Sequence, residues 1–236
     1  MKISTRLAFA ACATLGCSAL YAQEEPFTAS IALGYVGTTG NTDTTTFNTE
    51  WLARWRTERW THSAKFQGLG AQENDVTRAE RYYLEEKSDY NIDETQYLFG
   101  LGTWTDDRFS GFEYQATISG GYGRHLIRRE GLNLQAFAGL GYRKNDIVGL
   151  GTEGEGIVTF GENLAWTIST NAALTQSFTS DVGEELTVSK FEIGLETNIV
   201  GSITTKLAFQ ARNTSEVPAG TEKTDTMTSV SLLYNF

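Results

Sequence analysis

Histidine is the side chain best suited to acid–base catalysis near neutral pH, and this sequence contains only two, His62 and His125. Neither stands at the spacing from other ligands that a zinc site requires. Both cysteines, Cys12 and Cys17, lie close to the N-terminus. We therefore predict no metal site, no disulfide framework and no catalytic thiol in the rest of the chain.

The tripeptide Gly-Leu-Gly occurs at 68–70, 100–102, 139–141 and 149–151, which raises the question of nucleotide binding. A dinucleotide site needs such glycines between a strand and a helix. No helical pattern follows any copy, and the first three lie inside alternating segments. We therefore predict no bound cofactor, and we expect these glycines to make room in a crowded interior.

The elements that would position these residues are strands, because apolar side chains recur at every second position. From 27 to 35, Phe27, Ile31 and Tyr35 alternate with Thr28 and Ser30. The same period appears at 112–122, 132–143, 191–199 and 207–212. Turn signals divide the chain into twelve segments, near 27–37, 43–55, 60–70, 80–92, 95–106, 112–124, 131–143, 155–166, 169–180, 186–199, 203–213 and 224–236.

The fourth segment, 80–92, is the least regular, because its charged residues leave no clean apolar face. Propensity alone would also allow an amphipathic helix there. We predict a strand, because Tyr82, Leu84, Ser88 and Tyr90 share one face and a barrel of this kind needs an even strand count.

Segments of this length suit tilted strands that cross a bilayer. We predict an all-β fold, a closed antiparallel transmembrane β-barrel of about twelve strands, with a β-sandwich as the alternative. Connections after even segments are mostly short and should face the periplasm, whereas longer loops at 71–79, 144–154 and 214–223 should face outward.

Aromatic residues fall near the predicted strand ends, as expected for two membrane interfaces. One interface would have Trp55, Trp60, Tyr90, Tyr122, Trp166 and Tyr234, and the other Tyr35, Trp104, Tyr142 and Phe178.

The N-terminus has the pattern of a secretory signal peptide. Lys2 and Arg6 precede an apolar run at 7–20, and the preferred cleavage site follows Ala22, with Ala19 as an alternative. A lipoprotein cleavage site before Cys17 is disfavoured, because Leu15 stands one position closer to the cysteine than a lipoprotein signal requires. We therefore predict a signal peptide at 1–22 and a barrel domain at 23–236.

The remaining chain is acidic. Without Lys2 and Arg6 it has 17 basic and 29 acidic residues, a formal net charge of −12. Clustered Lys and Arg supply phosphate affinity, so we expect no nucleic-acid partner. Acidic residues at 106–107, 146, 153–155 and 181–185 should form a solvated outer rim, and a specific calcium site would need convergent oxygens.

Charged residues on the polar face of the segments are predicted to line the lumen. An isolated charge in a narrow interior is costly, so we expect a salt-bridged interior rather than a wide pore of one sign. The lumen candidates are Glu50, Arg54, Lys65, Arg81, Glu85, Glu113, Arg143, Lys190, Glu192, Lys206 and Arg212.

The last segment places Tyr234 and the terminal Phe236 on one apolar face. A terminal aromatic residue on an alternating strand is typical of the assembly signal that the barrel-insertion machinery reads. We predict that Tyr234 and Phe236 form this signal.

The stretch LGYVGTTGNTDT at 33–44 resembles the opening signature of the salt-induced outer-membrane protein family, a family built on a domain of unknown function. The resemblance continues at KSDY (87–90), DRFSGF (107–112), GGYG (120–123), AGLGY (138–142), KTDT (223–226) and YNF (234–236). It implies a bacterial outer-membrane barrel, and it brings no known activity, substrate or catalytic residue.

Three functions remain open. The leading prediction is a structural, envelope-maintaining barrel that admits water or small ions, with no enzymatic activity. The alternatives are a diffusion channel for a small solute and an outer-leaflet lipid-modifying enzyme. A continuous lumen would favour the channel, whereas a Ser or Asp within hydrogen-bonding distance of a histidine on the outward face would favour the enzyme. The expected partners are outer-membrane lipids, lipopolysaccharide and the barrel-assembly machinery.

Overall fold

The protein is all-β in the computed structural model, which describes residues 26–38, 44–108, 110–218 and 221–236. None of these residues forms a helix long and apolar enough to cross a membrane. The predicted signal peptide at 1–22 lies outside the described residues.

Twelve strands follow one another along the chain, as predicted. They are β1 (Phe27–Thr38), β2 (Thr44–Arg56), β3 (Trp60–Glu73), β4 (Val76–Asn91), β5 (Gln96–Asp107), β6 (Phe112–Arg129), β7 (Leu132–Ile147), β8 (Gly151–Ser169), β9 (Ala172–Gly183), β10 (Thr187–Val200), β11 (Ile203–Thr214) and β12 (Thr224–Asn235). The irregular fourth segment, predicted at 80–92, is strand β4. This confirms the strand that was predicted from the shared face of Tyr82, Leu84, Ser88 and Tyr90.

Each strand pairs antiparallel with its neighbours in sequence, and β1 pairs with β12, so the sheet closes into a barrel. Closure satisfies the backbone polar groups that an open edge would leave unpaired. The predicted closed antiparallel barrel is therefore confirmed.

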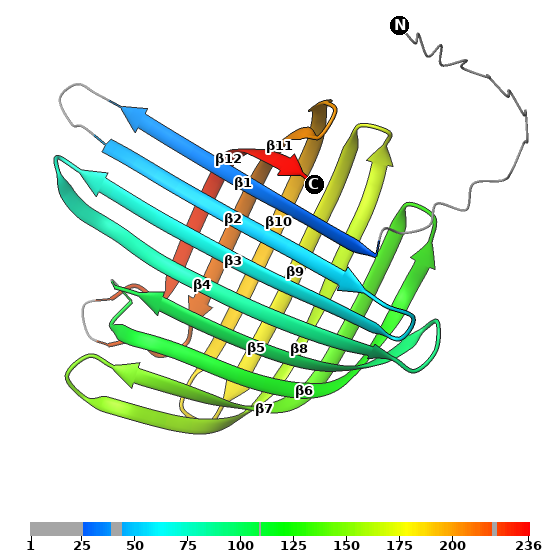
Figure 1. Ribbon diagram of the computed structural model, residues 1–236. Coiled ribbons are helices and arrows are strands. Elements are labelled where there is room, and N and C mark those ends of the chain that lie inside the picture. The colour runs from blue at the N-terminus through cyan, green and yellow to red at the C-terminus, as the bar shows by residue number, and fades with distance from the viewer. Residues whose placement is uncertain (1–25, 39–43, 109, 219–220) are drawn as a thin grey trace, which may run out of the picture.

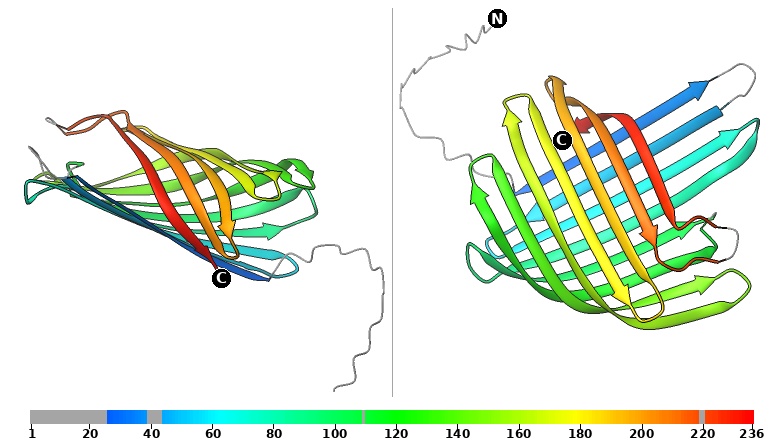
Figure 2. Two further views of the ribbon diagram at one scale, coloured as in Figure 1. Left: turned by 90° about the horizontal axis from the view of Figure 1, so that it is seen from above. Right: turned by 180° about the vertical axis from the view of Figure 1, so that it is seen from behind.

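The barrel is flattened. In Figure 1, β1–β5 form a front layer and β8–β12 a rear layer, and the strands of the two layers cross. The view from above in Figure 2 shows how thin the barrel is between these layers. Inward side chains from opposite layers can therefore meet.

Two loops predicted to be long are tight turns. β4 already begins at Val76, and Asn74 and Asp75 make the turn before it with positive φ angles of 50° and 59°. β7 extends to Ile147 and β8 begins at Gly151. The predictions of long loops at 71–79 and 144–154 were wrong, because the backbone pairing of β3 with β4 and of β7 with β8 continues beyond the strand ends expected from the sequence. The connection between β11 and β12 is long, as predicted.

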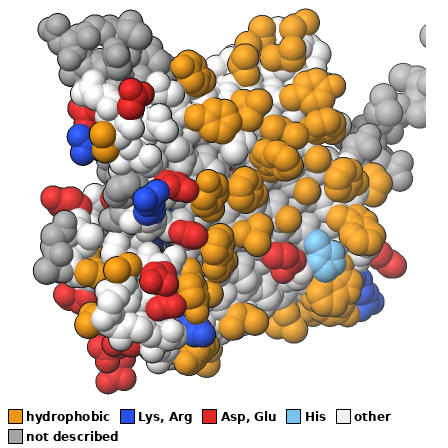
Figure 3. All heavy atoms as spheres, turned by 60° about the vertical axis from the view of Figure 1, so that its left-hand side comes forward, with side chains coloured by type: hydrophobic (Ala, Val, Ile, Leu, Met, Phe, Trp, Pro, Cys, Tyr) orange, Lys and Arg blue, Asp and Glu red, His pale blue; other side chains and the backbone are white. Residues whose placement is uncertain are grey.

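The outer wall is apolar. Leu33, Leu84, Ile118, Leu140 and Leu232 are each at least half exposed although they lie in the middle of strands, and Figure 3 shows hydrophobic side chains spread over one flank of the barrel. Aromatic residues are exposed near both ends of the strands. Trp60, Trp166 and Tyr234 lie toward the end with the short turns, where β2 connects to β3 and β8 to β9. Tyr35, Trp104 and Tyr142 lie toward the opposite, loop end, where β1 connects to β2 and β11 to β12. An apolar band between aromatic girdles is the surface of an outer-membrane barrel.

Candidate functional site

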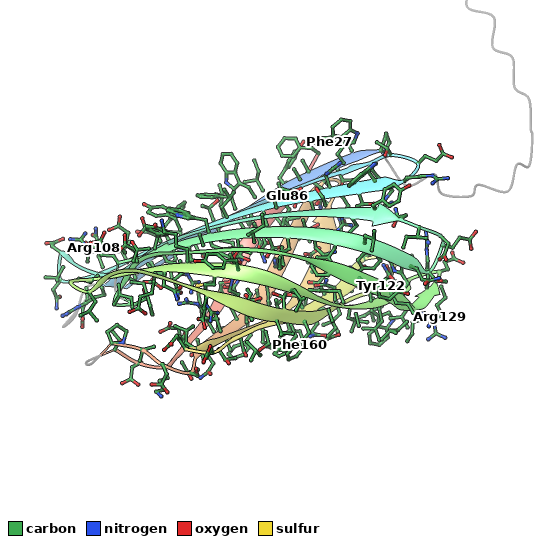
Figure 4. All side chains as sticks on the ribbon, turned by 90° about the horizontal axis from the view of Figure 1, so that it is seen from below. Phe27, Glu86, Arg108, Tyr122, Arg129 and Phe160 are labelled. Carbon is green, nitrogen blue, oxygen red and sulfur yellow. The ribbon has the colours of Figure 1, made fainter. Side chains whose placement is uncertain are left out.

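The interior of the barrel contains one cavity of about 1220 Å³ that is lined from both ends. Arg59 and Asp93 border it at the end with the short turns, and Arg78 and Glu222 border it at the loop end. Figure 4 places Arg129 and Arg108 at these two opposite ends. Residues from both ends of the barrel therefore border the same cavity.

A network of two lysines and two glutamates crosses the middle of this lumen. Lys65 Nζ of β3 lies 2.6 Å from Glu192 Oε2 of β10, and Lys206 Nζ of β11 lies 2.5 Å from Glu50 Oε1 of β2. Lys206 Nζ also lies 3.2 Å from Glu192 Oε1. Gln67 Nε2 donates to Glu50 Oε2 at 2.8 Å. The network links the front layer to the rear layer and narrows the passage.

Two further contacts join opposite walls nearer the loops. Lys190 Nζ of β10 lies over the Tyr83 ring of β4, 4.6 Å from its centroid. The guanidinium of Arg212 in β11 donates to the side-chain oxygen of Gln115 in β6. Because the barrel is flat, long side chains reach across it at several levels.

The charges that line the cavity are almost balanced. Eleven basic and twelve acidic side chains border it. A pore lined by one sign would focus a strong field on ions of the other sign, whereas alternating signs at close range cancel. The charges around the cavity therefore give it no strong field of one sign.

One part of the wall is aromatic. Tyr97, Phe99, Leu101 and Phe137 form a buried cluster on β5 and β7, and Phe99 packs edge-on against Phe137 with 5.0 Å between ring centroids. Lys87 Nζ lies 4.8 Å from the Tyr97 ring centroid. This cluster fills the lumen beside the cavity and reduces its width.

Nine of the eleven lumen candidates border the cavity in the structure: Glu50, Arg54, Lys65, Arg81, Glu85, Lys190, Glu192, Lys206 and Arg212. Arg143 is only 1% exposed but is set apart from the cavity. Its Nη2 lies 2.6 Å from Glu155 Oε1 and also donates to the Leu186 carbonyl. It therefore holds the loop between β9 and β10 against the wall.

Glu113 is the candidate that the structure places elsewhere, on the exposed side of β6. The pairing of β6 with β7 shifts register between Phe112 and Tyr114, and such a bulge inverts the alternation of faces. Phe112, which alternation with an inward Glu113 would place on the outward face, is instead 4% exposed and packs with Leu186 and Val188.

Sequence reasoning missed the aromatic cluster on β5 and β7. In the run Tyr97-Leu98-Phe99-Gly100-Leu101 apolar residues lie on both faces, so period two cannot tell which face points inward. The polar partners Gln67 and Gln115 were also missed, because glutamines on an inward face carry no charge signal.

The two histidines lie on different faces. His125 borders the lumen, and its ring lies 5.5 Å from that of Tyr97. His62 lies on the outer face, where its Nδ1 is 2.7 Å from Ser88 Oγ and 3.8 Å from Glu86 Oε1. Ser88 is therefore within the hydrogen-bonding distance that would favour an enzyme.

The contact between His62 and Ser88 lacks the geometry of a catalytic relay. A relay needs the serine at one ring nitrogen and the carboxylate at the other, whereas Ser88 and Glu86 both approach Nδ1. Backbone N–H groups around Ser88 are paired in the ladder with β3 and β5, so they cannot stabilise an oxyanion. In the described part of the chain, no group of three or more His, Cys, Asp or Glu side chains is placed to hold a metal ion.

Comparison with known proteins identifies relatives along the whole barrel. A family model described as "Protein of unknown function, DUF481" matches residues 31–236. The uncharacterized protein YdiY of Escherichia coli (strain K12) is 26% identical over 213 residues, which cover 90% of this chain and 84% of the relative.

Similar solved structures include the NanC porin, with 9% identity, coverage of 88% of this chain and 97% of that chain, and a TM-score of 0.49. The translocator domain of the autotransporter NalP from Neisseria meningitidis has 13% identity, coverage of 88% and 87%, and a TM-score of 0.47.

Proposed function

This chain belongs to the DUF481 family of proteins of unknown function, and we propose from its lumen that it is a narrow diffusion channel of the bacterial outer membrane. The solutes are water, small ions and other small polar molecules. The observation that carries this proposal is the continuous cavity of about 1220 Å³ that both ends of the barrel border.

The polar lining supports a channel rather than a solid structural barrel. A purely structural interior would be filled with side chains to the density of a protein core, whereas this one keeps a long open space beside the salt-bridged network. The network sets the free cross-section, so large solutes are excluded.

The balanced lining supports weak charge selectivity. With eleven basic and twelve acidic groups around the cavity, neither cations nor anions meet a sustained repulsive field. The channel should therefore discriminate by size more than by charge.

Swelling of proteoliposomes tests this function. Vesicles loaded with an impermeant polymer and diluted into isosmotic solutions of sugars of increasing size should swell with the smallest solutes and stop swelling as solute size increases. Vesicles that contain the protein but swell no faster than empty vesicles, for every solute, would leave the structural role as the better account.

A further inference from the structure

Glu86, Ser88 and His62 form a polar cluster on the lipid-facing wall of the barrel. Glu86 and Ser88 share the outward face of β4 with Leu84, which is 50% exposed. Ser88 Oγ donates to Glu86 Oε1 at 2.6 Å and lies 2.7 Å from His62 Nδ1. The side chains of His62 and Glu86 remain 41% and 56% exposed. Figure 3 shows a histidine and an acidic side chain among the hydrophobic ones, and Figure 4 labels Glu86 on the outer wall.

The cluster extends into the membrane from the aromatic girdle, because the His62 ring stacks on that of Trp60 with 5.6 Å between centroids. Trp60 and Tyr90 mark the interface at this side of the barrel, and their rings lie 5.1 Å apart. Glu86 precedes Tyr90 by four positions in β4, which corresponds to roughly 10 Å along the bilayer normal for a strand tilted by about 40°. The backbone of Glu86 is therefore beyond the lipid headgroups, and its carboxylate reaches back toward the girdle to meet Ser88 and His62. Ionisable residues inside a membrane mark functional contacts.

Small residues border Glu86 and Ser88 on the two neighbouring strands. The cross-strand neighbours of Glu86 are Ala64 on β3 and Gly102 on β5, and that of Ser88 on β5 is Gly100. An added Cβ at Gly100 or Gly102 would meet no atom within 4 Å. Small residues allow two membrane proteins to approach closely, and polar side chains then hydrogen-bond between them.

We infer that the lipid-facing surface around Glu86 is a contact between two copies of this chain within the membrane. The cluster is self-complementary: it presents a carboxylate and an imidazole side by side, so a two-fold axis brings Glu86 of each copy to His62 of the other. Among the described residues, His62 is the only basic side chain within 4.0 Å of Glu86, and a second copy supplies another.

A second outward carboxylate provides a matched control. Glu162 on β8 accepts a hydrogen bond from Gln176 Nε2 on β9 at 2.6 Å. The partner of Glu162 is an amide rather than an imidazole. A second copy would therefore bring no basic side chain from this pair to the carboxylate. Figure 4 labels Phe160, also on β8, on the wall opposite Glu86.

Disulfide cross-linking in native membranes tests the contact. The only cysteines are Cys12 and Cys17, in the predicted signal peptide, so Ala64→Cys gives one reactive position beside the cluster and Phe160→Cys one on the opposite wall. Oxidation should link Ala64→Cys into dimers and leave Phe160→Cys monomeric. Adding Glu86→Gln should lower the dimer yield about three- to tenfold, whereas Glu162→Gln should leave it unchanged.

Two further measurements keep the test decisive. Gly102→Leu should also lower the yield because it blocks close approach, whereas Gly70→Leu, on an equally open glycine of β3 near the loops, should not. Equal dimer yields from both cysteines, or a yield indifferent to Glu86→Gln and Gly102→Leu, would overturn the inference. The inference would also be overturned if the protein, extracted as a monomer from vesicles of defined composition, retained phosphatidylethanolamine and the Glu86→Gln variant did not. The cluster would then be a binding site for a lipid headgroup. Cross-linking does not depend on conductance, so this test is separate from that of the channel.

Discussion

Lys65 of β3 and Glu192 of β10 meet across the lumen, with 2.6 Å between Nζ and Oε2, although 127 positions separate them in the sequence. Together with Glu50 and Lys206 they form a neutral set of two cations and two anions that joins the two layers of the flattened barrel. The stability of the barrel and the width of its passage therefore depend on the same four side chains.

Lys206→Met should destabilise the folded barrel by about 3–5 kcal/mol, because the buried carboxylates of Glu50 and Glu192 would then share only Lys65 within this network and one buried negative charge would be uncompensated. Denaturant unfolding in detergent micelles measures this difference. Arg78→Met is the control, since Arg78 and its partner Glu73 are 61% and 40% exposed and an exposed pair contributes about 0–1 kcal/mol. Similar losses in both variants would contradict a stabilising role for the network.

Leu140→Arg should destabilise the barrel by up to roughly 2–4 kcal/mol, since Leu140 is 73% exposed on the lipid-facing wall and a charge there is costly. The same change at Gln135, which borders the cavity on the same strand, should have a much smaller effect because water can hydrate the charge. Unfolding in lipid vesicles compares the two. A larger loss at Gln135 would mean that the faces of β7 are inverted.

Phe236→Ala should reduce insertion into the outer membrane far more than Phe27→Ala. Both rings are exposed at the same end of the barrel, by 70% and 57%, so a simple loss of lipid contact would affect both variants alike. The predicted assembly signal of Tyr234 and Phe236 distinguishes them. Heat-modifiable mobility in gels reports the folded fraction, and equal yields would remove the signal role.

Asp93, in the turn between β4 and β5, should keep its negative charge to a lower pH than an aspartate in a model peptide. The backbone N–H of Thr95 and its hydroxyl donate to Asp93 Oδ1, at 2.7 and 2.9 Å, and they lower the pKa of Asp93 below its usual 3.8. The carboxylate therefore stabilises the turn fully above pH 3.8, and this contribution is lost only as the pH falls through the lower folded-state pKa. The carboxyl carbon shift of Asp93, followed over pH in micelles, should titrate below that of a model peptide, and an equal or higher midpoint would contradict the turn geometry.

Period two and turn signals predicted the strand count and the barrel, because a lipid-facing wall demands apolar residues at every second position. They failed where the alternation is broken. The register shift beside Phe112 exchanged the faces of Phe112 and Glu113, and the apolar run at 97–101 left both faces alike. Which inward charges pair could not be predicted either, because Lys65 and Glu192 meet only as a result of the flattened cross-section.

Single-channel recording of Ser177→Cys tests the central claim that the lumen conducts. Ser177 of β9 borders the cavity, whereas the next residue, Phe178, packs on the outer wall with 6.2 Å between its ring centroid and that of Phe160. The account predicts conductance steps that a bulky, water-soluble thiol reagent reduces in Ser177→Cys but not in Phe178→Cys. Absence of conductance in the folded protein, or steps that the reagent leaves unchanged at Ser177→Cys, would contradict it.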